Sequence, residues 1–250
     1  MERITSRQNS FLKQIGKWNS SRAQRRADGV FTGEGPKLLE EAVKAGVEVT
    51  AVVVEEGYAG ILPPAKRQIA VPGDLLQNLC DTKTPQGVLF VCKMPDLPPP
   101  EKLPQGKYLV LDGLQDPGNV GTIWRTADAL GADGLILVHN CADPFSPKTV
   151  RSTMGACFRL PVYEMEAEEL SGLLRTSEIP LYATALREDT VDVRVVKLNN
   201  CAVVIGSEGR GISDTMLQKS ERTIKIPMRE RCESLNAASA ATIVLWEMAR

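Results

Sequence analysis

Apolar and polar positions alternate in blocks over the second half of the chain, and the blocks predict strands that alternate with helices. Short apolar runs bounded by turn residues are typical of buried strands, whereas apolar positions three or four residues apart are typical of helices packed on one face. The pattern predicts strands at residues 108–112, 135–138, 181–184, 202–205 and 223–226, and helices at 120–130, 168–177, 213–219 and 236–248. This alternation indicates an α/β domain with a parallel sheet that helices cover on both faces.

The N-terminal part, residues 1–94, mixes helix and strand in a less regular order. Pro36 suits the first position of a helix at 37–44, and Gly46 suits the end of that helix. Buried strands are predicted at 47–55 and 88–92, with a helix near 74–79 between them. We see no catalytic constellation here and expect a binding or scaffolding role.

The first 26 residues combine an apolar stripe with many basic side chains. Phe11, Ile15 and Trp18 fall at positions i, i+4 and i+7 of a helix. The basic residues, set against the single acid Glu2, are Arg3, Arg7, Lys13, Lys17, Arg22, Arg25 and Arg26. Two interpretations stay open: a solvated amphipathic helix, or an electrostatic footprint for phosphates, with a membrane surface as the less favoured partner.

A proline-rich stretch at residues 95–104 separates these two patterns. Proline at this density gives a stiff, extended spacer with few backbone donors. We therefore predict an N-terminal domain at 1–94, a linker at 95–106 and a larger domain at 107–250.

Composition excludes several kinds of protein. The 250 residues carry 30 basic and 31 acidic side chains, so the overall charge gives no sign of nucleic acid. The start is too polar for a signal peptide, and no apolar run approaches the ~18–20 residues that span a bilayer. The single histidine, His139, disfavours a transition-metal site or a serine–histidine triad, and we expect it to be structural. The cysteines form no C-x-x-C pair and suit buried thiols in the reducing cytoplasm, our expected location; they are Cys80, Cys92, Cys141, Cys157, Cys201 and Cys232.

The most suggestive segment, residues 109–138, reads as strand, loop, helix and strand. Asn119 is a good helix N-cap type, and Gly131 suits the end of the helix. Because helical side chains lean toward the N-terminus, Arg125 should lie over Gly121 and reach toward the preceding loop. Open α/β sheets bind ligands at such strand-to-helix turns. Taken alone, the same pattern also describes a surface arginine on a capped helix.

Two later segments share this strand-to-loop character. An apolar strand runs into Gly206, Gly209 and Gly211, and Ser213 can cap the helix that follows. Residues 224–228 then lead, after a short loop, to a helix that Ser234 or Asn236 can cap and whose first turns, 237–241, are small enough for close packing. The competing class, a dinucleotide-binding oxidoreductase, fits poorly because the loop at 112–121 lacks the G-x-G-x-x-G spacing.

Together the three segments resemble the three motifs of the SpoU/TrmH family, RNA ribose 2′-O-methyltransferases of the SPOUT superfamily. The motifs are Asn119-x-Gly121-Thr122-Ile123-x-Arg125-Thr126-Ala127, then Gly206-x-Glu208-x-x-Gly211, then Ile226-Pro227-Met228 followed by Ser234-Leu235-Asn236-Ala237-Ala238. In the N-terminal part, Glu34-Gly35 and Thr84-Pro85-Gln86-Gly87-Val88 are similar to the family's substrate-binding domain of ribosomal-protein L30-like fold.

The resemblance implies S-adenosylmethionine as methyl donor, a C-terminal deep trefoil knot and a homodimer whose active sites draw on both subunits. It places the cofactor loops at Thr184, Gly206, Ile226 and Leu235, and the characteristic polar residues at Asn119, Arg125, Glu208, Ser234 and Asn236. The implied partner is structured RNA. A separate N-terminal RNA-binding unit suits a large folded target, so we expect ribosomal RNA first and transfer RNA second.

The chemistry of the polar set leaves one question open. A carboxylate is a weak base for an alcohol, and an arginine is almost never deprotonated. Our hypothesis is that Arg125 stays charged, holds a phosphate and stabilises the developing alkoxide, rather than taking the proton. Ser234 and Asn236 would orient the ribose hydroxyl, while Asn119 and Glu208 would brace the loops. A catalytically inactive RNA-binding protein of the same fold is the second hypothesis, and a nicotinamide oxidoreductase is a distant third.

Overall fold

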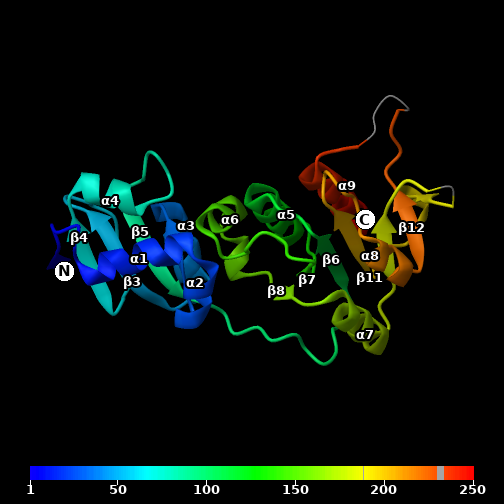
Figure 1. Cartoon of the computed structure of the whole chain (residues 1–250), viewed down its shortest axis with the longest axis horizontal. Coiled ribbons are helices and arrows are strands. Elements are labelled where there is room, and N and C mark those ends of the chain that lie inside the picture. The colour runs from blue at the N-terminus through cyan, green and yellow to red at the C-terminus, as the bar shows by residue number, and fades with distance from the viewer. Residues whose placement is uncertain (188, 230–233) are drawn as a thin grey trace. The chain divides into compact units, whose positions relative to one another are not determined.

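The computed structural model describes residues 1–187, 189–229 and 234–250, and it divides into two compact units (Figure 1). Unit 1 comprises Met1–Asp96 and Asp143–Phe158, and unit 2 comprises Leu97–Ala142 and Arg159–Arg250. Residues 143–158 thus group with unit 1, although in sequence they lie inside the predicted second domain. No helix among the described residues has the length and apolar character needed to cross a membrane.

Unit 1 contains a five-stranded mixed sheet in the order β1-β4-β3-β5-β2. Its strands are β1 (Glu2–Arg3), β2 (Val30–Glu34), β3 (Val49–Glu55), β4 (Arg67–Val71) and β5 (Val88–Lys93). Its helices are α1 (Ser10–Ser20), α2 (Arg22–Asp28), α3 (Pro36–Lys44), α4 (Gly73–Leu79) and α6 (Pro147–Thr153), with a 3₁₀ turn η1 (Ala156–Phe158). β5 pairs antiparallel with both β2 and β3, whereas β4 is parallel to β1 and β3.

The apolar stripe of α1 packs into the core of unit 1. Leu12, Ile15 and Trp18 are buried there, while Phe11 is only half-buried at the edge of the same cluster. The amphipathic helix predicted for this segment is confirmed. A second short helix, α2, follows it and ends at Gly29, which adopts a left-handed conformation with φ of 63°.

Arg25 was expected among the basic residues that could contact phosphates, but it is buried. Its side chain is 4% exposed and forms an ion pair with Asp143, whose side chain is 11% exposed. The guanidinium also donates to the backbone carbonyls of Trp18 and Asn19. Arg25 therefore links the α1–α2 corner to the loop before α6. Its buried guanidinium is used within the fold and is not available to a phosphate in solution.

Unit 2 is built on a seven-stranded sheet in the order β10-β12-β9-β11-β6-β7-β8. All of its strand pairs are parallel, which confirms the predicted parallel α/β architecture. The strands are β6 (Lys107–Asp112), β7 (Gly134–Val138), β8 (Val162–Glu164), β9 (Leu181–Thr184), β10 (Val191–Asp192), β11 (Cys201–Gly206) and β12 (Arg222–Lys225). The helices are α5 (Pro117–Ala129), α7 (Ala167–Ser177), α8 (Asp214–Lys219) and α9 (Ala237–Ala249), with a 3₁₀ turn η2 (Val193–Val195). The knot that the resemblance implies stays a prediction.

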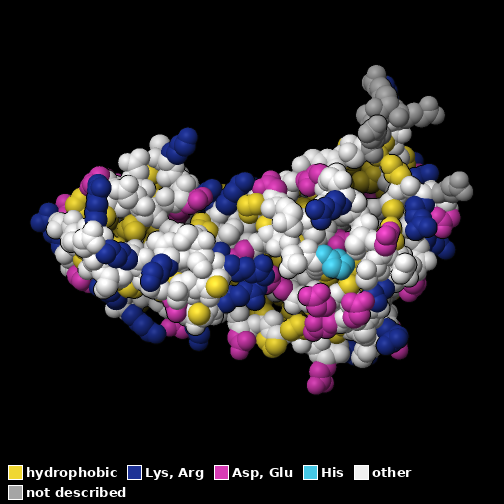
Figure 2. Space-filling model, viewed as in Figure 1, with side chains coloured by type: hydrophobic (Ala, Val, Ile, Leu, Met, Phe, Trp, Pro, Cys, Tyr) yellow, Lys and Arg dark blue, Asp and Glu magenta, His cyan; other side chains and the backbone are white. Residues whose placement is uncertain are grey.

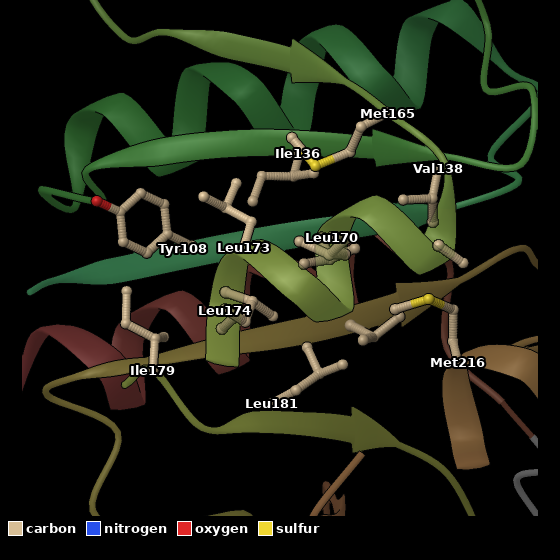
Figure 3. Close-up of a cluster of buried hydrophobic side chains, with 14 of the residues drawn as sticks. Tyr108, Ile136, Val138, Met165, Leu170, Leu173, Leu174, Ile179, Leu181 and Met216 are labelled. Carbon is tan, nitrogen blue, oxygen red and sulfur yellow. The ribbon is translucent and has the colours of Figure 1, made fainter. Parts of the chain in front are cut away.

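Helices cover both faces of this sheet. On one face, α7 and Met216 of α8 pack against Val110, Ile136 and Val204, and Figure 3 shows the α7 side chains interleaved with those of the strands. Neighbouring positions along the same strands point to the opposite face, because side chains alternate along a strand. There α5 and α9 pack against each other and contact β7 and β11.

The proline-rich stretch is anchored at its C-terminal end. Leu103 is buried in the core cluster of unit 2, and its amide donates to the Ser177 hydroxyl at 2.9 Å. The Tyr108 hydroxyl donates to the Pro104 carbonyl, also at 2.9 Å. The stiff segment predicted from its prolines therefore ends as part of the fold of unit 2.

Candidate functional site

The first motif segment begins a helix earlier than predicted. Asp116, not Asn119, is the N-cap of α5: its carboxylate accepts from the Gly118 amide at 3.0 Å, and Pro117 occupies the first helical position. Proline is favoured there because it needs no amide partner and its φ is already helical. Asn119 thus lies in the first turn of α5, with its side chain available for contacts outside the helix.

The second segment is a tight loop that leaves β11 at Gly206. The Ser207 amide donates to the Gly211 carbonyl at 3.1 Å, and the Gly211 amide donates back at 2.9 Å. A Cβ on Gly206 would lie 2.3 Å from the Gly211 carbonyl carbon, so only glycine fits at this position. Gly211 has a φ of 68°, the left-handed region that favours glycine. The loop presents Glu208 at its exposed tip, and Ser213 caps α8 as predicted.

The third segment enters α9 through Asn236. Of the two caps considered, the structure uses Asn236, whose side-chain oxygen accepts from the amides of Ala238 at 2.9 Å and Ser239 at 3.3 Å. The Asn236 amide group donates to the Asn119 side-chain oxygen at 3.4 Å, and the Asn119 amide group donates to the Glu208 carboxylate. One hydrogen-bond network therefore connects all three motif segments.

A hollow of about 420 Å³ lies beside this network, at the carboxyl ends of β9, β11 and β12. Ligands of open parallel sheets bind at such ends. Its walls include Thr184, Gly206, Ile226 and Leu235, the four residues that the resemblance assigns to the cofactor, together with Glu208 and Ser234. The Thr184 hydroxyl donates to the Val204 carbonyl at 2.8 Å, so this residue offers a ligand mainly its backbone. Three basic residues that the sequence analysis did not single out also line the hollow: Arg187, Arg210 and Lys225.

Arg125 does not line this hollow. It is exposed and makes no hydrogen bond or ion pair with any residue of the described ranges 1–187, 189–229 and 234–250. Instead it borders a second hollow of about 440 Å³ between the outer faces of α5 and α9, beside Ile243 and Trp246. Trp246 is 59% exposed, which is unusual for the largest apolar side chain. Within one chain, Arg125 is therefore separate from the network that Asn119 joins.

The single histidine takes part in a small polar cluster that the sequence analysis did not foresee. His139 Nδ1 lies 2.7 Å from Asp112 Oδ1, and the other oxygen of Asp112 accepts from the Ser213 amide at 2.7 Å. The Ser213 hydroxyl also lies near Nδ1, at 3.4 Å, whereas a catalytic triad needs the serine on Nε2. Asp112 thus ties the end of β6 to the start of α8 and to His139, which is coloured cyan in Figure 2.

Thiol reactivity and metal binding depend on the cysteines and acidic residues, and two of the described cysteines, Cys141 and Cys201, are buried. No group of His, Cys, Asp or Glu suited to a metal occurs in the part of the chain that the structure describes. Burial raises the pKa of the Cys141 thiol to about 11 and that of Cys201 to about 12, so both thiols stay protonated and unreactive near neutral pH. Cys232 lies outside the described residues.

Comparisons with known proteins cover both units. The model of the SpoU rRNA Methylase family matches residues 106–246, and that of the MRM3-like substrate binding domain matches residues 9–89. The 23S rRNA (guanosine(2553)-2′-O)-methyltransferase RlmP of Bacillus subtilis is 32% identical, over 99% of both chains. The AdoMet-bound SpoU methyltransferase AviRb from Streptomyces viridochromogenes aligns with a TM-score of 0.88 at 29% identity, over 97% of both chains. The AdoMet-bound rRNA methyltransferase from Sinorhizobium meliloti gives 0.85 at 30% identity, over 99% of this chain and 97% of its own.

Proposed function

The chain belongs to the SpoU rRNA methylase family, and from this premise we propose that it transfers the methyl group of S-adenosylmethionine to a ribose 2′-hydroxyl of ribosomal RNA. The observation that carries the proposal is the hollow at the ends of β9, β11 and β12, which the four expected cofactor residues line together. The Bacillus subtilis relative is named as a 2′-O-methyltransferase of 23S rRNA, and two similar structures hold AdoMet. These likenesses give no support to the oxidoreductase alternative.

The hollow suits S-adenosylmethionine, which supplies an electrophilic methyl group when bound. Ile205, Ile224 and Leu235 offer apolar walls for a flat ring, and Gly206 lets the backbone come close to a ligand. We assign Thr184, Gly206, Ile226 and Leu235 to the cofactor, mostly through backbone groups.

The hydrogen-bond network gives the polar residues different tasks. Asn119 and Glu208 hold the first two motif segments in place, which is a positioning role. Asn236 caps α9 and donates one amide hydrogen to Asn119, so its second amide hydrogen is left for a ribose hydroxyl. Ser234 lines the cofactor hollow and can orient the same hydroxyl. Positioning of this kind supplies a large part of the rate of an in-line transfer.

Arg125 is assigned to charge stabilisation, with a second copy of the chain completing the site. In one chain it borders the exposed apolar hollow on α5 and α9, away from the cofactor hollow. A second copy seated on this face would bury Trp246 and could carry Arg125 to the partner's cofactor hollow. Because arginine is almost never deprotonated, its task there is to hold a phosphate and stabilise the developing alkoxide.

We assign RNA binding to residues 1–94 and methyl transfer to 107–250, with 95–106 as linker. Lys13, Lys17 and Arg26 are exposed on α1 and α2, and Figure 2 shows basic side chains spread over this side of unit 1. Such a surface suits an RNA backbone. Because the proposed substrate is ribosomal RNA, the cytoplasm is the proposed location.

The test is methyl transfer to ribosomal RNA from cells that lack this protein. The purified chain and methyl-labelled S-adenosylmethionine should label one ribose, seen as a nucleotide bond that resists alkaline hydrolysis. Wild-type RNA, already modified, is the control and should take up little label. Label on a base, or no label while RNA still binds, would contradict the proposal, and the second result would favour an inactive RNA-binding protein.

A further inference from the structure

A third hollow lies wholly within unit 1, where β2 leads into α3. It measures about 270 Å³, near the lower limit of ligand pockets, and suits part of a nucleotide rather than a whole cofactor. Its walls come from the end of β2 and the start of α3, from the loop before β5, and from α6 with Met154 just after it. Both N-terminal stretches that resemble the family's substrate-binding domain contribute: Glu34 and Gly35 from one, Thr84 and Gln86 from the other.

The charged residues that line this hollow are Glu34, Lys37 and Arg151. Glu34 is used internally, because its carboxylate accepts from the Asp81 amide and from the Thr82 hydroxyl at 2.8 Å. Arg151 donates to Asp81 at 2.9 Å. Lys37 is exposed and forms no hydrogen bond or ion pair with any residue that the structure describes, although its charge acts through space on the Glu40 carboxylate. An anion in the hollow would therefore meet an ammonium group that no acid contacts directly.

The remaining walls combine apolar surface with unused polar groups. Leu38 is buried, whereas Met154 is 41% exposed although it is apolar. Thr84 and Gln86 are exposed, and among the described residues their side chains have no hydrogen-bond partner. Gly35 has a φ of 93°, which favours glycine, and the Gln86 side chain lies against it at the start of α3.

We propose that this hollow receives one unpaired nucleotide of the substrate RNA, its base against Leu38 and Met154 and its phosphate beside Lys37. Sequence-specific proteins read RNA mainly at unstacked bases, which pack against flat or apolar side chains and hydrogen-bond along their edges. Thr84 and Gln86 supply donors and acceptors for such an edge, and phosphate contacts fix the register. The inference rests on the proposed function for the identity of the ligand as RNA, but it concerns a site separate from the cofactor hollow.

The test compares Lys37→Ala and Gln86→Ala with Lys83→Ala in the full chain. Lys83 is exposed in the same loop region but does not line the hollow, so Lys83→Ala is a control for the loss of one positive charge.

The probe is a ribosomal RNA transcript that contains 4-thiouridine. We expect Lys37→Ala to weaken RNA binding several-fold and to lower the slope of log affinity against log salt by about 1, as loss of one phosphate contact requires. Gln86→Ala should weaken binding with an unchanged salt slope. Photo-crosslinks should map to peptides that contain residues 34–38 or 84–86.

Separate readouts distinguish failure of this inference from failure of the proposed function. All three variants should bind S-adenosylmethionine as the wild type does, since none lines the cofactor hollow. Equal RNA affinity and salt slope for Lys37→Ala and Lys83→Ala, with crosslinks elsewhere, would overturn the inference even if methyl transfer occurs. Crosslinks in the hollow with no methyl transfer by the wild type would support the inference and overturn the proposed function.

Discussion

Asn119 and Glu208 are 89 residues apart in the chain, yet the Asn119 side-chain amide donates a hydrogen bond to the Glu208 carboxylate. Asn119 is fixed in the first turn of α5, and Glu208 stands at the tip of the loop that leaves β11. Asn236 extends the connection to the start of α9. The tip of this loop belongs to no helix or strand. The hydrogen bond from Asn119 on α5 therefore holds Glu208 in place beside the cofactor hollow.

The first prediction concerns Glu208, which the network uses as an acceptor. Glu208→Ala removes the acceptor and should lower the single-turnover rate of methyl transfer about 100-fold, as misplacement by about 1 Å can do. Glu208→Gln keeps a side-chain oxygen for Asn119 and should retain most of the activity. Thermal unfolding of both variants should match the wild type, because the side chain is exposed. If Glu208→Gln is as inactive as Glu208→Ala, the negative charge itself is needed and a purely bracing role is wrong.

A second prediction tests the glycine loop. Gly206→Ala places a methyl group 2.3 Å from the backbone of Gly211, so the loop must open where it lines the cofactor hollow. We expect loss of S-adenosylmethionine binding by calorimetry and destabilisation by about 1–3 kcal/mol, the usual range for overpacking. Gly209→Ala is the matched control, because a Cβ there meets nothing within 4 Å. Equal cofactor affinity for the two variants would show that the tight turn does not shape the site.

The sequence predicted the helices and strands of unit 2 well where they are long and buried. Strand β9 has the bounds expected from its apolar run, and α9 begins after Asn236, one of the two caps predicted for it. The start of α5 was missed because Asn119 and Asp116 are equally good cap types. Pro117, which suits the first position of a helix, was the signal that favours Asp116. Strands β8 and β10 were missed because such short strands depend on pairing with β7 and β12, which lie far away in sequence.

The candidate site was predictable in part. Each motif lies at a strand end or a helix start. For this reason the motifs identified residues that line the cofactor hollow or join the Asn119–Glu208–Asn236 network. The separation of Arg125 from that network was not predictable, because it depends on how α5 packs against α9. The burial of Arg25 was likewise invisible, since its partner Asp143 lies 118 residues away.

The third prediction concerns this buried ion pair. Arg25→Met should lower the free energy of unfolding by about 3–5 kcal/mol, because it removes the ion-pair partner of the largely buried Asp143 carboxylate. The measurement is a urea titration followed by circular dichroism. The double variant Arg25→Met with Asp143→Leu should recover much of the loss. Arg3→Ala, which breaks an exposed pair with Glu56, is the control and should change stability little. A small effect of Arg25→Met would mean that solvent reaches the Arg25–Asp143 pair.

The fourth prediction tests whether Arg125 acts on the partner's site. In the proposed dimer, the Arg125 of one subunit and the Glu208 of the other belong to the same site. Arg125→Ala and Glu208→Ala should each be nearly inactive alone. After subunit exchange in an equal mixture, about half of the dimers should contain one subunit of each variant. In each mixed dimer, one of the two symmetric sites has both native residues, so about a quarter of all sites are native.

The same mixture decides between a shared site and a site within one chain. If both residues act in the same subunit, every site in the mixture lacks one of them, and no activity returns. Trp246→Glu provides the control for assembly: it should give monomers by analytical ultracentrifugation, because it places a charge on the exposed apolar face of α9. Ile61→Glu changes an equally apolar residue, 97% exposed in unit 1, and should leave the dimer intact. Monomeric Trp246→Glu that keeps wild-type activity would refute the shared site, since Arg125 would then have to act within its own chain.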